Sequence, residues 1–97
     1  MFVAVARVDL HIPAAASLKD KRAVVQSVSK RLANQFPVSI AEVSAQEQWG
    51  LAVLGIAVAS GSPAHAREVI EAVLHTLERM RLDAEVGTVE IDVIAAF

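Results

Sequence analysis

The chain has 97 residues, a formal net charge of −2 and a hydrophobic content of 55%, values typical of one folded domain and not of a disordered chain. Aromatic residues make up only 4%, so the core must be built from aliphatic side chains and few stacking platforms exist. Cysteine is absent, which excludes disulfides, thiolate metal sites and cysteine nucleophiles.

The first half of the chain predicts a strand followed by a helix. Residues 2–12 alternate between two faces, one wholly apolar, which is typical of a strand with one face in the core. Pro13 ends this strand. Ser17, followed three residues later by Asp20, resembles a capping box and marks a helix start. An apolar stripe at helical spacing continues to about Gln35, before a proline that ends the helix.

Two further strands and a second helix follow. Residues 38–43 predict a second strand, and residues 51–59 a third. The third is apolar at almost every position, which is typical of a strand buried on both faces. Ser62 and Pro63 have the residue types of an N-cap and a first helical position, and we expect this helix to end at about Leu82.

Alternation returns over residues 86–97 and predicts a fourth strand, so the order of elements is βαββαβ. Two βαβ halves with right-handed crossovers predict a single α+β domain over residues 1–97. Its four-stranded antiparallel sheet carries both helices on one face, the ferredoxin-like arrangement, and the other face lies open. Because this fold hosts enzymes, metal carriers and RNA binders, it does not indicate a function by itself.

Four features of the chain together resemble the YlxP-like family of uncharacterised bacterial proteins. They are the segments SLKDKR (residues 17–22) and FPVSIAEV (residues 36–43), with Trp49 and Gly55. The resemblance covers the whole chain and implies a ferredoxin-like fold. It also implies genes that neighbour those of translation and ribosome maturation, and it brings no catalytic residue with it.

The helix predicted to begin after Ser17 is basic, while acidic residues dominate the rest of the chain. Its cations could contact a phosphate or an RNA backbone, or they could form a solvated face that keeps the protein soluble. The candidate binding residues are Lys19, Lys21, Arg22 and Lys30.

Helical phase separates Lys21 from the other cations. At 100° per residue, Lys19 and Lys30 point away from the sheet, whereas Lys21 falls on the core side. A lysine in that position must extend to the edge of the core or find a carboxylate. Glu42 faces the same side from the end of the second strand nearest the helix start. We therefore predict a structural pair between Lys21 and Glu42.

The open sheet face is the second candidate surface. Its apolar half should unite the first and fourth strands through Val3, Val5, Ile94 and Ala96. An apolar patch of this kind usually marks a partner surface, so we expect a homodimer through it.

The charged half of the same face supports an alternative function. A small-ligand-binding domain or an enzyme could work in a pocket at the dimer interface, near His11, Asp9 and Glu90. A cross-strand ion pair to Arg7 is the simpler interpretation of these carboxylates. The three histidines are too far apart in sequence for a short ligand motif, so we expect no metal and no cofactor.

The aromatic residues do not favour RNA recognition of the RRM type. The third strand has no aromatic residue and no cation, so it cannot stack bases as such domains do. We expect Trp49, the only tryptophan, to cover the sheet edge rather than to act as a ligand platform. If RNA is bound, the basic helix must bind it.

We therefore interpret the sequence as a non-catalytic accessory protein, linked to translation or ribosome maturation through its basic helix. The expected partners are a second copy of the chain and either ribosomal RNA or a ribosome-associated protein, with no membrane and no readout of DNA sequence. No apolar run reaches the ~20 residues that cross a bilayer, so we expect a cytoplasmic protein that is neither exported nor membrane-spanning.

Overall fold

A computed structural model describes residues 1–80 and 84–97 of the chain. The elements follow the predicted order, and their bounds are β1 (Phe2–His11), α1 (Leu18–Gln35), β2 (Ser39–Ser44), β3 (Leu51–Ser60), α2 (Pro63–Arg79) and β4 (Glu85–Ala95). The helix end predicted at about Leu82 lies outside the described residues, and α2 as described ends at Arg79.

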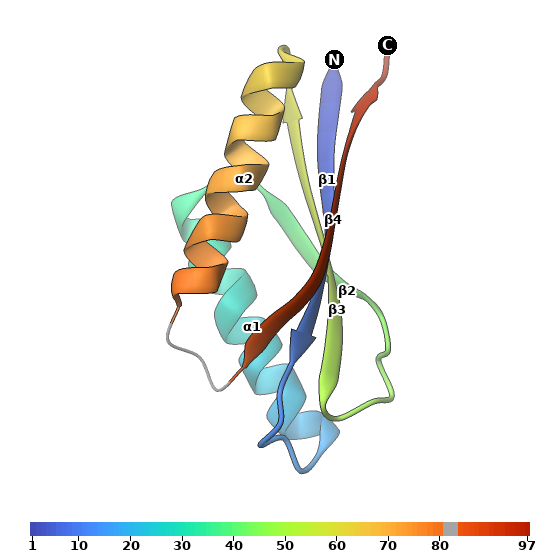
Figure 1. The fold of residues 1–97 in the computed structure, drawn as a ribbon, viewed down its shortest axis with the longest axis vertical. Coiled ribbons are helices and arrows are strands. Elements are labelled where there is room, and N and C mark those ends of the chain that lie inside the picture. The colour runs from blue at the N-terminus through green and yellow to red at the C-terminus, as the bar shows by residue number, and fades with distance from the viewer. Residues whose placement is uncertain (81–83) are drawn as a thin grey trace.

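The four strands form one antiparallel sheet in the order β2-β3-β1-β4. Both helices cover the same face of this sheet, and no described element covers the other face (Figure 1). The ferredoxin-like arrangement predicted from the sequence is therefore confirmed. Its two edge strands are β2 and β4.

The core lies between the sheet and the two helices. Alternate residues of β1 and β3 point towards the helices and are almost fully buried, as are the inward faces of α1 and α2. Aliphatic side chains fill this layer, as the low aromatic content requires. Within the described residues, no helix is long and apolar enough to cross a membrane.

The two faces of β3 differ in burial, contrary to the expectation that both are buried. Ala52, Leu54 and Ile56 face the helices and are at most 1% exposed. On the opposite face Ala57 is only half-buried, whereas Val53 is 8% exposed and Gly55 is covered by Val43. The nearly continuous apolar run of β3 therefore places apolar side chains on the open face as well.

Local capping fixes where each helix begins. The Ser17 hydroxyl accepts a hydrogen bond from the Asp20 amide at 3.1 Å, and the Asp20 carboxylate accepts one from the Ala16 amide at 2.9 Å. At α2, the Ser62 hydroxyl accepts from the His65 amide at 3.3 Å. These bonds satisfy amides that a helix start otherwise leaves free. The bond at Ser17 marks the start of α1, and the start of the helix determines the direction in which each α1 cation points.

Candidate functional site

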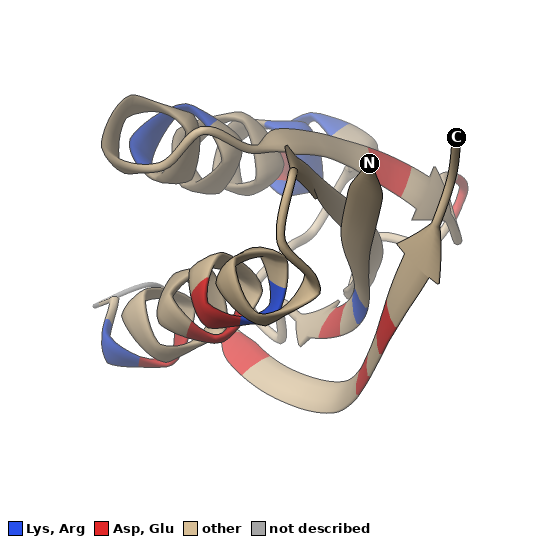
Figure 2. Cartoon of the chain, turned by 90° about the horizontal axis from the view of Figure 1, so that it is seen from above, with Lys and Arg blue, Asp and Glu red and all other residues tan. Residues whose placement is uncertain are grey.

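Helix α1 carries a row of cations on its outer side. Lys19, Arg22 and Lys30 are all exposed, and we call these three residues the basic stripe. From Lys19 to Lys30 the helix rises about 16 Å, at 1.5 Å per residue. Figure 2 shows that Lys and Arg dominate α1, whereas α2 carries charges of both signs. The stripe is therefore a local region of positive charge on a protein of net charge −2.

The cations of the basic stripe have no carboxylate partner among the described residues. The three ion pairs found there join Arg7 to Glu90, Lys21 to Glu42, and Arg67 to Glu71. The one acid on α1, Asp20, accepts a hydrogen bond from a backbone amide at the helix start. The stripe therefore keeps its positive charge available to an anionic partner.

Lys21 lies in the core and does not belong to this surface. It is 1% exposed, and its Nζ lies 2.8 Å from Oε2 of Glu42. The structure thus brings together the two residues of the predicted structural pair. It also corrects the inclusion of Lys21 among the binding residues, because helical phase turns this side chain inward and leaves its ammonium out of reach of a partner.

The Lys21 ammonium also binds three backbone carbonyls. It donates to Ala45 O at 2.8 Å, Gln46 O at 3.0 Å and Leu51 O at 3.2 Å. An ammonium has three protons, and these carbonyls use all of them. Glu42 Oε2 accordingly receives no aligned hydrogen bond, and its contact with Lys21 is an ion pair. Sequence reasoning found the carboxylate but missed the carbonyls, which depend on a loop conformation.

These carbonyls belong to the connection between β2 and β3, which we call the β2–β3 loop (residues 45–50), and to the first residue of β3. The loop is tied down further by Gln48 N to Ala45 O at 3.0 Å and by Ile12 N to Gly50 O at 2.9 Å. Trp49 on this loop is 54% exposed. This exposure is greater than expected for a tryptophan that covers the sheet edge, because more than half of the residue is accessible to solvent.

The open sheet face has the predicted apolar half. Val3 lies directly opposite Ile94, which is 48% exposed, while Val5 lies opposite Asp92. Ala96 follows the end of β4, and its amide donates to Met1 O at 2.8 Å. On β3 the apolar surface continues through Ala57 and Ala59, which lie opposite Val5 and Val3. Val43 of β2 packs over Gly55, in the row of Arg7 and Glu90.

The side chain of Val43 packs directly on the backbone of Gly55 on this face. A Cβ atom at position 55 would lie 2.7 Å from Cγ1 of Val43, so the valine occupies the space that a side chain would fill. A bulge between Glu42 and Ser44 in the β2–β3 pairing accompanies this packing. The bulge region thus has Glu42 beside Lys21 in the core and Val43 on the open face, where it is 52% exposed.

The charged half of the open face brings together two of the three groups of the alternative site, His11 and Asp9, while Glu90 is paired with Arg7. Arg7 pairs with Glu90, and these two residues line a shallow depression together with Asp92. His11 and Asp9 both lie beside Gly87, where a Cβ atom would lie 2.6 Å from the His11 Nε2 and 3.5 Å from the Asp9 Cβ. A bulge between Val8 and Leu10 in the β1–β4 pairing separates the two regions. The residues that the structure describes contain no group of three or more ligand side chains able to hold a metal ion.

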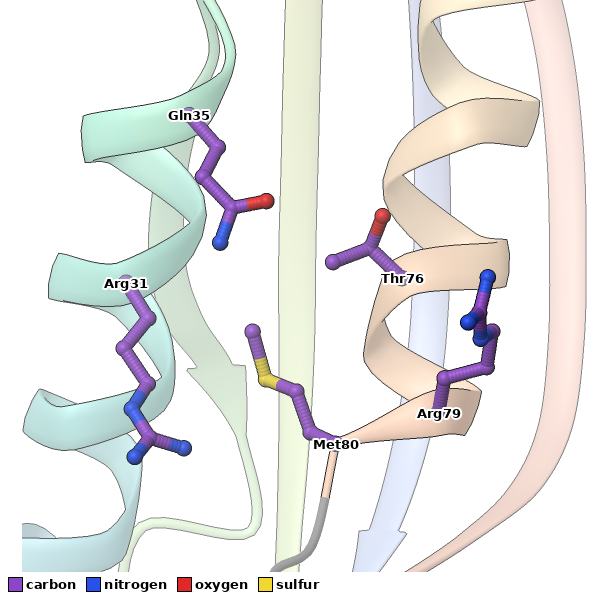
Figure 3. Close-up of a pocket in the computed structure, with 5 residues that line it drawn as sticks. All are labelled: Arg31, Gln35, Thr76, Arg79 and Met80. Atoms are coloured by element: carbon purple, nitrogen blue, oxygen red, sulfur yellow. The ribbon is translucent and has the colours of Figure 1, made fainter.

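A groove of about 420 Å³ separates the outer sides of the two helices. It is lined by Arg31, Gln35, Thr76, Arg79 and Met80. Figure 3 shows Gln35, Thr76 and Met80 directed into the space between the helices, with the two arginines at its rims. The groove also fixes the orientation of α1: the flank bearing Arg31 faces α2, so Arg22, half a turn around the helix, faces away from α2.

Two comparisons place the chain among known proteins. A family model described as "Protein of unknown function (DUF503)" matches residues 3–91. The chain is also 40% identical over 60 residues to "Uncharacterized protein YlxP" of Bacillus subtilis (strain 168). That match covers 62% of this chain and 65% of the Bacillus protein. Both matches agree with the resemblance found in the sequence, and neither description names a ligand or a partner.

Proposed function

We propose that this chain, which belongs to the YlxP-like DUF503 family of proteins of unknown function, is a non-catalytic accessory protein that binds RNA through the basic stripe of α1. The observation that carries the proposal is the exposure of Lys19, Arg22 and Lys30 on one helix, none of them paired to a carboxylate among the described residues. The ribosome is the expected source of that RNA, because the family resemblance implies genes that neighbour those of ribosome maturation.

The electrostatics of the molecule favour an anionic partner at α1 and disfavour one at the sheet. Phosphate groups bind surface cations mainly by releasing condensed counterions, which requires unpaired positive charge on the protein. The basic stripe offers such charge. On the open sheet face, Arg7 is paired with Glu90, and Asp9 and Asp92 leave an excess of negative charge that repels a phosphate backbone.

The charged half of the sheet does not favour catalysis. Acid–base chemistry requires a base within hydrogen-bonding reach of its partner groups. Here Glu90 pairs with Arg7, whereas His11 and Asp9 lie beside Gly87 at a strand bulge. Because Glu90 is engaged by Arg7, the structure gives no support to a ligand pocket built from all three of His11, Asp9 and Glu90.

We further propose that the apolar half of the open face carries a second copy of the chain. The apolar side chains there include Val3, Val5 and Ile94, and Asp92 lies opposite Val5 at the border with the charged half. A two-fold axis through the apolar half would pair it with itself and keep the acidic halves of the two copies apart. Such a dimer leaves both basic stripes exposed on the helical side.

Co-sedimentation with ribosomal particles tests the RNA proposal. We expect the wild-type protein to sediment with the particles at low salt and to be released as salt rises. The double variant Lys19→Glu/Arg22→Glu should stay in the supernatant. The matched control Arg31→Glu/Arg79→Glu changes the net charge equally but alters the groove facing α2, and it should still sediment. If both double variants lost co-sedimentation equally, the assignment of RNA binding to the basic stripe would be contradicted.

A further inference from the structure

We infer that Trp49 is a stacking platform for an unpaired base, so that the ligand of the basic stripe is single-stranded RNA. The inference rests on the proposed function and deepens it by naming the form of RNA bound. It is carried by the exposed indole, by the anchoring of its loop, and by the position of that loop beside the first turn of α1.

The exposure of Trp49 calls for an explanation. Tryptophan has the largest apolar surface of any side chain and is usually well buried. Here its exposed fraction is 54%, and it is one of five large hydrophobic residues that are exposed in the described part of the chain. Trp49 thus provides an accessible aromatic face on a protein that has only four aromatic residues, three Phe and one Trp.

The loop that carries Trp49 is held by specific bonds. Lys21 donates to carbonyls of Ala45, Gln46 and Leu51, which lie on both sides of the tryptophan. Ile12 N donates to the carbonyl of Gly50, the next residue after Trp49. Ala45 adopts a left-handed backbone with φ of 60°, which turns the chain at the start of the loop. A platform held in this way loses little conformational entropy when a ligand stacks on it.

The anchor of this loop lies within the basic segment itself. Lys21, which holds the loop, stands in the chain between Lys19 and Arg22 of the basic stripe. Because Arg31 faces α2, the flank of α1 that bears Arg22 faces away from α2, towards the β2 side of the molecule. Figure 1 shows the start of α1 and the β2–β3 loop at the same end of the molecule, opposite to the two termini.

Proteins recognise single-stranded nucleic acids with two kinds of side chain, cations and exposed aromatic rings. Phosphates contact the cations, while the face of a base stacks on the aromatic ring, and each stack typically contributes about 5- to 160-fold in affinity. A duplex cannot use the platform, since its bases already stack on one another. A protein surface could also cover an indole, but an adjacent row of unpaired cations favours a polyanion.

The intrinsic fluorescence of Trp49 provides a direct test, because the chain contains no other tryptophan and no tyrosine. We would titrate the protein with a single-stranded oligouridylate, with a duplex RNA of the same length, and with inorganic polyphosphate. The single strand should quench the emission strongly, whereas polyphosphate should bind the stripe and leave the emission nearly unchanged. Equal quenching by polyphosphate, or bound single strand without quenching, would overturn the inference.

Variants separate this inference from the proposed function. Trp49→Ala should weaken binding of the single strand at least 5-fold and leave binding of the duplex unchanged, while Trp49→Phe should retain most of the affinity. If Trp49→Ala binds the single strand like the wild type, the stacking inference fails and RNA binding by the stripe stands. If Lys19→Glu/Arg22→Glu binds both RNAs like the wild type, the proposed function fails. Circular dichroism checks that every variant folds.

Discussion

Lys21 is the residue on which both the core and the candidate surface depend. Its ammonium neutralises Glu42 and satisfies three carbonyls at the start and end of the β2–β3 loop. A buried charge is tolerated only when it is paired and hydrogen-bonded, and Lys21 meets both conditions. It joins α1, β2 and β3 at one point and so sets the position of the loop that bears Trp49.

Replacing Lys21 should destabilise the protein strongly. Lys21→Met leaves the half-buried Glu42 and three carbonyls without their partner, so we expect a loss of about 3 kcal/mol in the free energy of unfolding. Lys21→Met/Glu42→Leu should recover part of that loss by removing the orphaned carboxylate. Urea denaturation measures the unfolding free energy of the single and the double variant. The control Lys30→Met on the exposed face of the same helix should change stability by less than ~0.5 kcal/mol. A Lys21→Met loss no larger than this would refute the role given to Lys21.

The sequence predicts this site only in part. Helical phase is sufficient to turn Lys21 inward and to bring Glu42 near it, because both follow from local periodicity and strand order. The carbonyl partners could not be predicted, since they depend on the path of a loop without periodicity. The exposure of Trp49 was missed for the same reason: a short polar connection does not reveal which way its single large side chain points.

At the scale of elements, the first turn of α1 organises the surface. Ser17 and Asp20 bond to backbone amides there, which fixes the start of the helix and with it the phase of Lys19, Arg22 and Lys30. These caps were readable in the sequence because they depend on residues at fixed short spacing. The groove between α1 and α2 could not be predicted from the sequence, because it depends on how two helices far apart in sequence lie on the sheet.

Removal of the α1 cap gives a moderate and measurable effect. Ser17→Ala deletes the oxygen that accepts from the Asp20 amide, so we expect a loss of about 1 kcal/mol in unfolding free energy. Ser27→Ala, at an exposed position inside the same helix, should be neutral or slightly stabilising, because alanine favours helices. Thermal denaturation of the two variants compares them. Equal stability of the two would show that the cap does not hold the helix start.

For the whole molecule, element order and periodicity were enough to predict the fold. The open face shows the limit of that reasoning, since the apolar run of β3 predicts burial on both faces while helices cover only one. The uncovered apolar half, in which Val3 lies opposite an Ile94 that is 48% exposed, is the physical basis for the proposed dimer.

The dimer is tested by placing a charge at its centre. Wild-type protein should have about twice the 10.3 kDa chain mass in light scattering after size-exclusion chromatography. Ile94→Asp should be monomeric, because the new carboxylate would be desolvated at the interface. Ala72→Asp, on the exposed side of α2, adds the same charge and should remain dimeric. A wild-type mass of one chain at every concentration would exclude the dimer.

The central claim, that the basic stripe binds an RNA backbone, is tested most directly by the salt dependence of RNA affinity. Fluorescence anisotropy with a labelled single-stranded RNA gives the dissociation constant at each salt concentration. Three phosphate contacts predict a log–log slope of about −2, a loss of roughly 20-fold between about 50 and 200 mM salt. Lys19→Glu/Arg22→Glu should bind weakly with a slope near zero. A double variant with the affinity and slope of the wild type would contradict the account.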